Sequence, residues 1–227
     1  MAHNHPSFGI SRRAFLVGAL GLGAASLTAC SGSGQAAATS ASSAASNDSQ
    51  SGPITEASGD YAQGFHDATI EVEGYGTIKL QLNGTVAPVT VTNFAKLANS
   101  GFYDGLTFHR IIEGFMIQGG DPKGNGTGGS DRTIVGEFAD NGHANPISHV
   151  RGTISMARSS APDSASSQFF IMQEDMPSLD GQYAAFGHVT EGIEVLDAIA
   201  EAAKPTDSNG TIAPEDQPKI SSIRVGD

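Results

Sequence analysis

The sequence contains no tryptophan and a single cysteine, Cys30, among its 227 residues. One cysteine cannot form an intramolecular disulfide, so the folded part of the chain must be stable through its hydrophobic core alone. Because Cys30 lies in the N-terminal segment, no cysteine nucleophile is expected in the folded part either.

Basic residues are also scarce. Lysine and arginine number 12 against 24 aspartates and glutamates, which gives a formal net charge of −12 at pH 7. So acidic a chain is unsuited to bind the phosphate backbone of nucleic acids, or to dock by charge on anionic lipid headgroups. We therefore expect neither as a partner.

The usual motifs of cofactor and metal enzymes are missing as well. The glycine-rich segment GGDPKGNGTGG at residues 119–129 lacks the Gly-Lys-Ser/Thr ending of a phosphate-binding loop. Read as a calcium loop from Asp121, it has Lys123 at the third position and Arg132 at the twelfth, where oxygen ligands are needed. No metal and no cofactor are therefore expected.

Histidines and serines form no catalytic pattern. His109, His143 and His149 do not have the spacing of zinc ligands and are predicted to be structural or surface residues. The serines lie mostly in flexible, Ala/Gly-rich stretches, without the Gly-X-Ser-X-Gly pattern of a nucleophile elbow. Nothing in the sequence indicates hydrolytic or redox chemistry.

The N-terminal residues 1–29 have the layout of an export signal. The paired Arg12 and Arg13 precede an apolar run of about 14 residues, too short to span a bilayer as a helix, and the pair resembles a twin-arginine signal. The run ends in LTAC, which resembles the lipobox of bacterial lipoproteins and predicts that Cys30 is lipidated. The alternatives are an uncleaved anchor or an ordinary secretory signal.

Two further segments follow the signal. Residues 30–62 are rich in Ser, Ala and Gly, and this composition cannot bury a core, so it predicts a flexible tether. Residues 63–227 are enough for one folded domain. The mature protein is expected to be a monomeric domain that the lipid on Cys30 holds to the outer face of the cell membrane.

The domain begins with alternating patterns. In residues 68–82, apolar and polar side chains alternate on both sides of a glycine-containing turn, which predicts a β-hairpin. The alternating segment KISSIRV near the C-terminus is expected to pair with the first strand. Further short strands are predicted at residues 106–112, 115–119, 153–156, 169–172 and 185–189.

Two segments have helical periodicity instead. In APVTVTNFAKLANSGFYDG, Pro88 suits the first helical turn and Gly101 follows as a stop. In TEGIEVLDAIAEA, Glu191 and Glu194 suit the positive N-terminal end of a helix. Many short strands with two helices predict a mainly β fold, an antiparallel barrel whose ends the helices cover.

One charged residue stands in an apolar segment. Arg110 lies within FHRIIEGFMIQGGD, where Met116 and Gln118 share one face of a strand. Gln168 and Phe170 share a strand face in SSQFFIM in the same way. One arginine, two glutamines and apolar neighbours make a site for a ligand that is both apolar and amide-like.

These motifs carry a resemblance to a known family. FHRIIEGFMIQGGD, followed in order by NGTGG, ISMAR, SSQFFI and LDGQYAAFG, is similar to the cyclophilin-type peptidyl-prolyl cis-trans isomerases, from about Gly76 to Ala200. The resemblance implies an eight-stranded antiparallel barrel closed by two α-helices. It also implies an enzyme that speeds the isomerisation of X–Pro bonds in peptides and unfolded proteins.

The resemblance further implies the roles of individual residues. Arg110 matches the family's catalytic arginine, and Phe115 and Gln118 are expected to act beside it. The other residues expected to bind substrate are Met116, Gly126, Ala157, Arg158, Gln168, Phe170, Leu179 and Tyr183.

Three positions depart from the well-studied eukaryotic members. Ser178 stands where they have a tryptophan, Tyr183 where they have a histidine, and Arg158 where they have an asparagine. Tyr183 still offers an aromatic wall and a hydroxyl, whereas Arg158 adds a cation that is expected to change which residues flank the preferred proline. Tight binding of cyclosporin, which uses the tryptophan in that family, is not implied.

Two other interpretations stay open. A non-catalytic module could bind Pro-containing peptides with the same groove, as a chaperone or scaffold, although such a module has no need of Arg110. A solute-capturing lipoprotein would fit the lipobox, but a single domain of this size has no two-lobed organisation.

Overall fold

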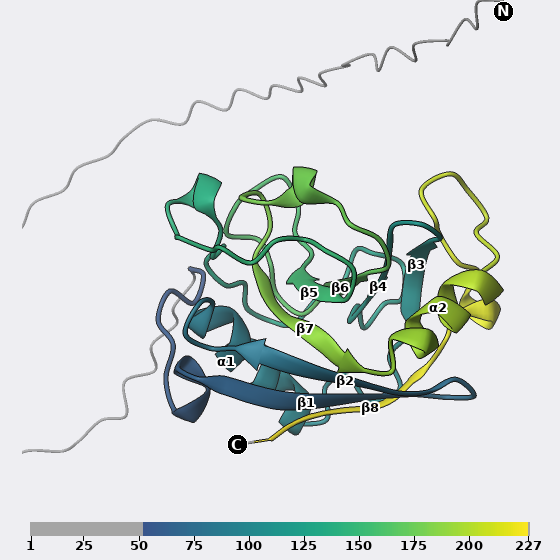
Figure 1. Cartoon of the computed structure of the whole chain (residues 1–227), viewed down its shortest axis with the longest axis horizontal. Helices are drawn as coiled ribbons and strands as arrows, with labels where there is room; N and C mark the ends of the chain where they lie inside the picture. The colour runs from purple at the N-terminus through teal and green to yellow at the C-terminus, as the bar shows by residue number, and fades with distance from the viewer. Residues whose placement is uncertain (1–51, 227) are drawn as a thin grey trace, which may run out of the picture. The chain divides into compact units, whose positions relative to one another are not determined.

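The structure, a computed structural model, describes residues 52–226, whose arrangement is shown in Figure 1. The predicted signal, Cys30 and the first part of the predicted tether lie outside the described residues. No helix within residues 52–226 is long and apolar enough to cross a bilayer.

The described chain contains one antiparallel sheet of eight strands and two α-helices. The strands lie in the order β3–β4–β6–β5–β7–β2–β1–β8. Their bounds are β1 Phe65–Val72, β2 Gly76–Asn83, β3 Phe108–Ile112, β4 Met116–Gly119, β5 Thr153–Met156, β6 Phe169–Met172, β7 Ala185–Glu191 and β8 Ile220–Val225, and those of the helices are α1 Pro88–Asn99 and α2 Ile193–Ala202. The predicted mainly β class, the eight strands and the two helices are confirmed.

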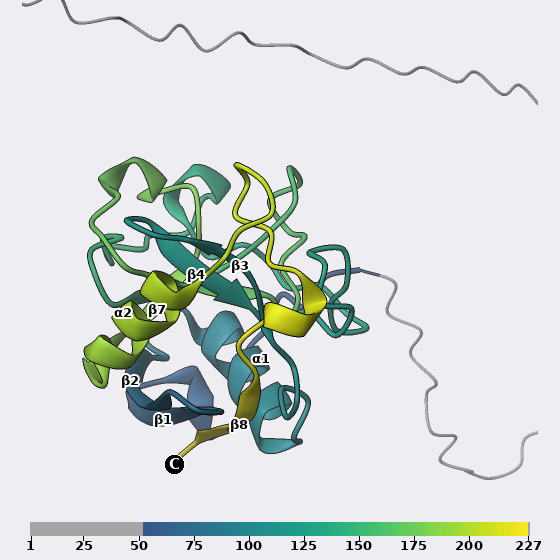
Figure 2. The ribbon, with the colours of Figure 1, turned by 90° about the vertical axis from the view of Figure 1, so that its right-hand side faces the viewer.

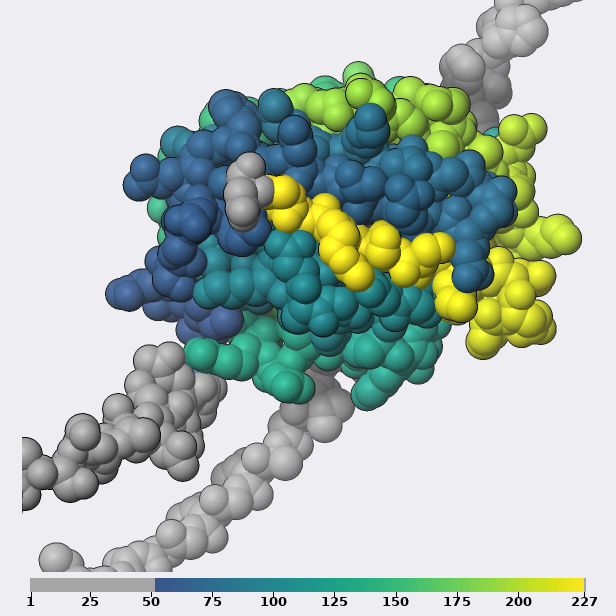
Figure 3. Space-filling view, turned by 90° about the horizontal axis from the view of Figure 1, so that it is seen from below, coloured from purple at the N-terminus to yellow at the C-terminus, as the bar shows by residue number. Residues whose placement is uncertain are grey.

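The sheet curves until its two edges meet. β8 pairs with β1, as the alternating C-terminal segment predicts. Just before β3 and β8, Thr107 and Lys219 form an antiparallel bridge, and the N–H of Phe108 donates to the carbonyl of Pro218 at 2.9 Å. Figure 3 shows β8, in yellow, between the blue β1–β2 hairpin and the teal chain that leads into β3. These contacts join the edges of the barrel.

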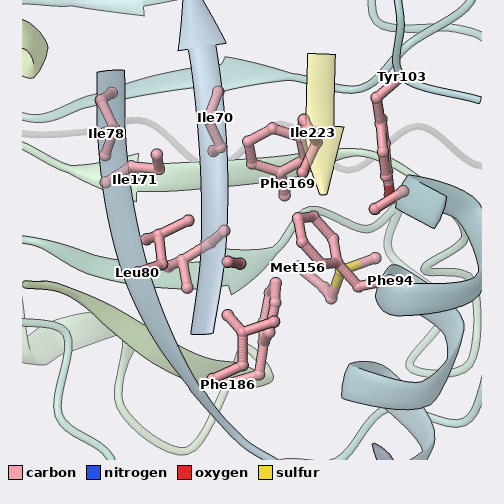
Figure 4. Packing of buried hydrophobic residues seen from close by; sticks show 14 of the residues in the cluster. Ile70, Ile78, Leu80, Phe94, Tyr103, Met156, Phe169, Ile171, Phe186 and Ile223 are labelled. Atoms are coloured by element: carbon pink, nitrogen blue, oxygen red, sulfur yellow. The ribbon is translucent and has the colours of Figure 1, made fainter. Parts of the chain in front are cut away.

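The barrel interior holds the main hydrophobic core, which Figure 4 shows from close by. Aliphatic side chains from β1 and β2 line one side of it. On the other side, the Phe94 ring of α1 meets three buried aromatic rings, with centroid distances of 5.3 Å to Tyr103, 5.5 Å to Phe169 and 5.2 Å to Phe186. Phe94 therefore anchors α1 to the barrel through one aromatic cluster.

The start of α1 has a distant capping group. Pro88 occupies the first helical turn, as predicted, and no neighbouring side chain caps the helix. Instead the buried carboxylate of Glu137 accepts hydrogen bonds from the N–H groups of Val89 (3.0 Å) and Thr90 (2.8 Å). A carboxylate at this end satisfies free N–H groups and lies at the positive end of the helix dipole.

The start of α2 differs in part from its prediction. The helix begins at Ile193, after Gly192 in the left-handed conformation, and Glu194 lies in its first turn as expected. The placement of Glu191 at the helix end was wrong. Glu191 is the last residue of β7, where it pairs with Lys79 of β2 and forms an ion pair of 2.7 Å with it. β7 extends beyond its last apolar residue because Glu191 still pairs with Lys79 of the neighbouring strand β2.

The chain before β1 lies against the domain. Ile54 forms a parallel bridge with Ile134, and its N–H donates to the carbonyl of Thr133 at 2.8 Å. Further along, the ring of Tyr61 meets that of His66 edge-on at 5.1 Å. The described end of the predicted tether is therefore packed, and the domain begins earlier than residue 63.

Candidate active site

β4 and β6 supply both the core and an outer wall. Ile117 and Ile171 belong to the interior core, whereas Met116, Phe170 and Met172 form a second apolar cluster on the opposite face. The split follows from the alternation of side chains along a strand. The same two short strands thus build a hydrophobic wall outside the barrel.

A β-bulge in β3 brings Arg110 to this outer face. Phe108 pairs with Gly119 and Arg110 with Gln118, so β3 advances two residues where β4 advances one. Phe108 and Ile111 consequently both belong to the core, although they are three positions apart and regular alternation would place them on opposite faces. The bulge explains how a charged side chain is accommodated in an apolar segment.

A hollow of about 230 Å³ opens on the outer face. It is lined by Arg110, Phe115, Met116, Gln118, Ala157, Arg158, Phe170, Leu179 and Tyr183. A second, more polar hollow of about 270 Å³ shares three of these residues and reaches Gly126 and Gln168. The two hollows bring together every site residue predicted within the domain. We call them the apolar hollow and the polar hollow.

A chain of hydrogen bonds crosses the boundary between the hollows. The Nη1 of Arg110 donates to Oε1 of Gln118 at 3.1 Å, and Nε2 of Gln118 donates to Oε1 of Gln168 at 2.9 Å. The Nε2 of Gln168 donates in turn to the carbonyl of Gly128 at 2.8 Å. Since each amide accepts at its oxygen and donates at its nitrogen, the orientation of both glutamines is determined.

Arg110 keeps its charge without an acidic partner. Burial lowers the pKa of Arg110, while Tyr183 and Asp207 act in the opposite direction, and a guanidinium stays charged at neutral pH. None of the carboxylates within residues 52–226 forms an ion pair with it. Its Nε donates to the backbone carbonyl of Asn209 at 2.7 Å. The charge is therefore oriented by neutral groups and is not cancelled.

Arg158 is a second fixed cation, at the boundary of both hollows. Its guanidinium lies between the rings of Phe138 and Tyr183, 4.9 Å and 4.8 Å from their centroids. Its Nε and Nη2 donate to the carbonyl of Gln182, and Nη1 donates to that of Ser159 at 2.9 Å. Within the described chain it forms no ion pair either.

A polar cluster of His149, Asp180 and Ser155 supports the wall from behind. The Nδ1 of His149 lies 2.9 Å from Oδ1 of Asp180, and its Nε2 lies 3.0 Å from Oγ of Ser155. The imidazole stacks on Phe170 at 6.0 Å with an interplanar angle of 19°. Ser155 is fully buried. Its hydroxyl is thus closed to substrate, and the arrangement is structural, as predicted for His149.

The protonation state of His149 follows from its surroundings. Burial lowers the pKa of His149 although Asp180 acts to raise it. A neutral ring satisfies both contacts when Nδ1–H donates to the carboxylate of Asp180 and Nε2 accepts from the hydroxyl of Ser155. The stacked ring behind Phe170 therefore introduces no charge at the apolar wall.

Asp121, in the glycine-rich segment, organises the loop after β4. Its buried carboxylate accepts hydrogen bonds from the N–H groups of Lys123 (2.8 Å), Asn125 (3.0 Å) and Gly126 (2.6 Å). Burial alone would raise the pKa of Asp121, but these N–H groups and that of Gly128 lower it. Asp121 thus shapes the wall of the polar hollow. No cluster of three potential metal ligands occurs within residues 52–226.

Comparison with known sequences agrees with this geometry. The family model described as "Cyclophilin type peptidyl-prolyl cis-trans isomerase/CLD" matches residues 68–225. The chain is 50% identical over 123 residues to peptidyl-prolyl cis-trans isomerase B of Bacillus subtilis, which covers 54% of this chain and 82% of the relative. It is 49% identical over 132 residues to a peptidyl-prolyl cis-trans isomerase of Synechococcus elongatus, with 58% and 85% covered.

Solved structures give the same result. The fold is similar to the crystal structure of a cyclophilin-type peptidyl-prolyl cis-trans isomerase of Cryptosporidium parvum, with a TM-score of 0.63 and 33% identity over 72% of this chain and 99% of that chain. The structure of that protein in the presence of the dipeptide Ala-Pro gives a TM-score of 0.62 and 32% identity over 71% and 99%. The chain belongs to the cyclophilin-type peptidyl-prolyl cis-trans isomerases, the enzymes that interconvert the cis and trans forms of X–Pro bonds.

Proposed function

We propose that this isomerase acts on exported proteins, and that Arg110 makes the interaction that speeds the reaction. The observation that carries the catalytic assignment is the placement of Arg110. A charged guanidinium, held by neutral acceptors and unpaired with any described carboxylate, borders an apolar hollow of about 230 Å³. An apolar wall beside a hydrogen-bond donor fits a proline ring and the amide that precedes it.

The reaction explains why a single donor matters. X–Pro bonds isomerise over a barrier of about 18–20 kcal/mol because the amide must lose its resonance. No covalent bond is made or broken, so neither a nucleophile nor a cofactor is needed. When the amide twists, a lone pair returns to the prolyl nitrogen. The guanidinium of Arg110 can donate to that nitrogen in the twisted state and not in the planar one, which is selective stabilisation of the transition state.

The other site residues hold the two ends of the substrate. Phe115, Met116, Phe170 and Leu179 form the apolar surface for the proline ring, with Tyr183 as the outer aromatic wall. The amides of Gln118 and Gln168 bind the substrate backbone, and Gly126 and Ala157 line the neighbouring groove. The structure of the Cryptosporidium parvum isomerase was determined in the presence of the dipeptide Ala-Pro, which supports a proline-containing peptide as the ligand.

The contribution of Arg110 can be compared with the total lowering of the barrier. Raising the rate from about 0.01 per second to the order of 1000 per second requires lowering the barrier by about 7 kcal/mol. One preorganised donor contributes about 2.7–4 kcal/mol in comparable sites. We assign a contribution of this order to Arg110, and the remainder to holding the ring while the preceding carbonyl rotates.

A non-catalytic peptide-binding module is the competing function. The test is a protease-coupled assay of the full chain with a short prolyl peptide. We expect isomerisation that accelerates in proportion to the chain concentration. Binding of the peptide without acceleration would favour the scaffold or chaperone interpretation instead.

Export and anchoring rest on the N-terminal sequence. Arg12, Arg13 and the LTAC segment support a twin-arginine signal and a lipid on Cys30. A disulfide-free domain that folds through its core also suits export in the folded state. Mass spectrometry of the mature protein should find an acylated N-terminal Cys30. The Cys30→Ser variant should no longer be found in the membrane fraction. A mature N-terminus elsewhere, or an unmodified Cys30, would overturn this part.

A further inference from the structure

The loop that follows α2 lies alongside β3, on the side of Arg110 away from β4. Figures 1 and 2 both show this yellow loop beside β3. Arg110 and Thr211 form an antiparallel bridge, and the N–H of Ile111 donates to the carbonyl of Gly210 at 2.8 Å. The N–H of Ile212 donates to the carbonyl of His109 at 3.0 Å. Residues 205–212, here called the β3 loop, therefore continue the sheet beyond its edge strand.

This loop makes direct contact with the guanidinium. The carbonyl of Asn209 accepts from Nε of Arg110 at 2.7 Å, while Gln118 accepts from Nη1 at 3.1 Å. Because the guanidinium is planar and rigid, two acceptors on different nitrogens determine both its position and its plane. Within residues 52–226, Nη2 has no hydrogen-bond acceptor. The two anchors leave that nitrogen to a substrate.

One side chain holds the β3 loop in this shape. The carboxylate of Asp207 accepts from the N–H of Asn209 (2.9 Å), the N–H of Thr211 (3.1 Å) and the hydroxyl of Thr211 (2.9 Å). The N–H of Gly210 adds a bond of 3.2 Å to the backbone carbonyl of Asp207. These hydrogen bonds, that of the Thr211 backbone first, lower the pKa of Asp207, so its carboxylate is ionised at neutral pH.

The loop is also pressed closely onto β3. Gly210 has a φ of 85°, and a Cβ there would lie 2.4 Å from Cγ1 of Ile112 and 2.6 Å from the carbonyl oxygen of Ile111. No other residue fits this position without moving the loop. The carbonyl of Asn209 is thus held at a defined distance from the strand that carries Arg110.

We propose that Asp207 is a positioning residue for the isomerase reaction: its carboxylate folds the β3 loop so that the carbonyl of Asn209 orients the guanidinium of Arg110. This inference rests on the catalytic role proposed for Arg110. Asp207 lines neither hollow, and it reaches Arg110 through Asn209 and Thr211, which accompany Arg110 in the wall of a third hollow. It also supplies a negative charge near a half-buried cation.

The first test is kinetic. We expect Asp207→Ala to lower kcat of the full chain by roughly 5- to 20-fold with little change in KM. A misdirected donor stabilises the transition state less but leaves substrate binding unchanged. Asp207→Asn keeps one acceptor oxygen and should lose less. In an Arg110→Ala background, Asp207→Ala should have no further effect. An unchanged kcat, or the same loss without Arg110, would contradict the proposal.

The second test does not depend on activity. The Arg110 Nε–H should give a slowly exchanging signal in ¹H–¹⁵N spectra, and Asp207→Ala should speed its exchange with water at least several-fold. If Arg110→Ala proves fully active, the proposed catalytic role fails, while this signal still decides whether Asp207 orients the side chain. Unchanged exchange in Asp207→Ala would overturn the positioning role.

A matched control is Asp104→Ala. Asp104 is a surface carboxylate that also holds its partners by hydrogen bonds, to Arg224 at 2.6–2.7 Å, and it lines neither hollow. We expect it to leave kcat and the Arg110 signal unchanged. Should Asp104→Ala reproduce the loss, the effect would be one of general stability, and the proposal would be wrong. If Asp207→Ala fails to fold, Asp207→Asn carries both tests.

Discussion

Arg110 and Gln118 face each other across the β3–β4 pair, with Nη1 of the arginine 3.1 Å from Oε1 of the glutamine. The contact exists because the bulge in β3 turns Arg110 out of the core and because alternation in β4 turns Gln118 to the same face. It joins the charged group to the amide chain that ends at Gly128. The site is therefore a property of strand register as much as of residue type.

Removing the amide of Gln118 tests this contact. Gln118→Leu should lower kcat/KM by about tenfold, since one hydrogen bond to a charged group is lost and Arg110 keeps its Asn209 anchor and a weak contact of 3.9 Å to Sδ of Met116. Gln168→Leu should have a smaller effect because it touches Arg110 only through Gln118. Steady-state kinetics with a prolyl peptide measure both. Equal losses in the two variants, or none in Gln118→Leu, would contradict the order of the hydrogen bonds from Arg110 through Gln118 to Gln168.

Arg158 is expected to select acidic substrates. It is a fixed cation between the hollows with no described carboxylate partner, so Asp or Glu beside the proline should raise kcat/KM roughly two- to fivefold over an alanine peptide. The preference should weaken at high salt, because the pair is partly exposed. Arg158→Asn should abolish this preference while leaving kcat/KM for the alanine peptide unchanged. A preference that survives in Arg158→Asn would assign selection to another group.

Glu137 should be important for stability far from the site. Glu137→Ala leaves the N–H groups of Val89 and Thr90 buried without an acceptor, and we expect a loss of about 2–4 kcal/mol in the free energy of unfolding. Glu137→Gln keeps an acceptor and should lose less. Urea unfolding measures both variants. Full stability of Glu137→Ala would show that another group caps α1.

Stability should fall on mild acidification. Burial lowers the pKa of His149 and of His109 below the ordinary 6.5, although Asp180 and Asp121 respectively act to raise them. The unfolded chain then binds protons that the folded chain does not, so the stabilisation is fully present above about pH 6.5 and decreases as the pH falls toward the folded values. Each histidine contributes a slope of at most about 1.4 kcal/mol per pH unit.

The measurement is urea unfolding from about pH 7.5 to about pH 5. His149→Gln should flatten the dependence, since it removes one of the two groups. The carboxylates whose pKa values are lowered, such as Asp121, contribute only at more acidic pH. A constant free energy of unfolding over this range would show that neither histidine is protected from protonation.

Local patterns predicted the fold well. Alternation in the hairpin of residues 68–82 and in the last strand is a local signal, and the pairing of β8 with β1 follows from it. Pro88 marks the start of α1 for a similar reason. The bulge next to Phe108 has no glycine or proline to mark it, so its effect on Arg110 could be described only from the pairing register.

Long-range polar contacts could not be predicted. Asn209 is 99 positions from Arg110 and contributes a backbone carbonyl, which any residue possesses. Glu137 is 48 positions from Val89, and nothing near α1 indicates that its cap comes from elsewhere. Residue type and strand alternation indicated Arg110, Met116, Gln118, Gln168 and Phe170, whereas the other site residues came from the resemblance to a family. Their supports at Asp207, Asp121 and His149 came from the three-dimensional structure.

The catalytic role of Arg110 is decided by comparing kcat and peptide affinity in Arg110→Ala. Selective stabilisation of the twisted amide predicts that kcat falls by about 10²–10³-fold, while the dissociation constant of a prolyl peptide changes only a few-fold. The variant must unfold at the same temperature as the wild-type chain. A folded Arg110→Ala that isomerises the peptide at the wild-type rate, or one that loses only affinity, would contradict the catalytic role of Arg110.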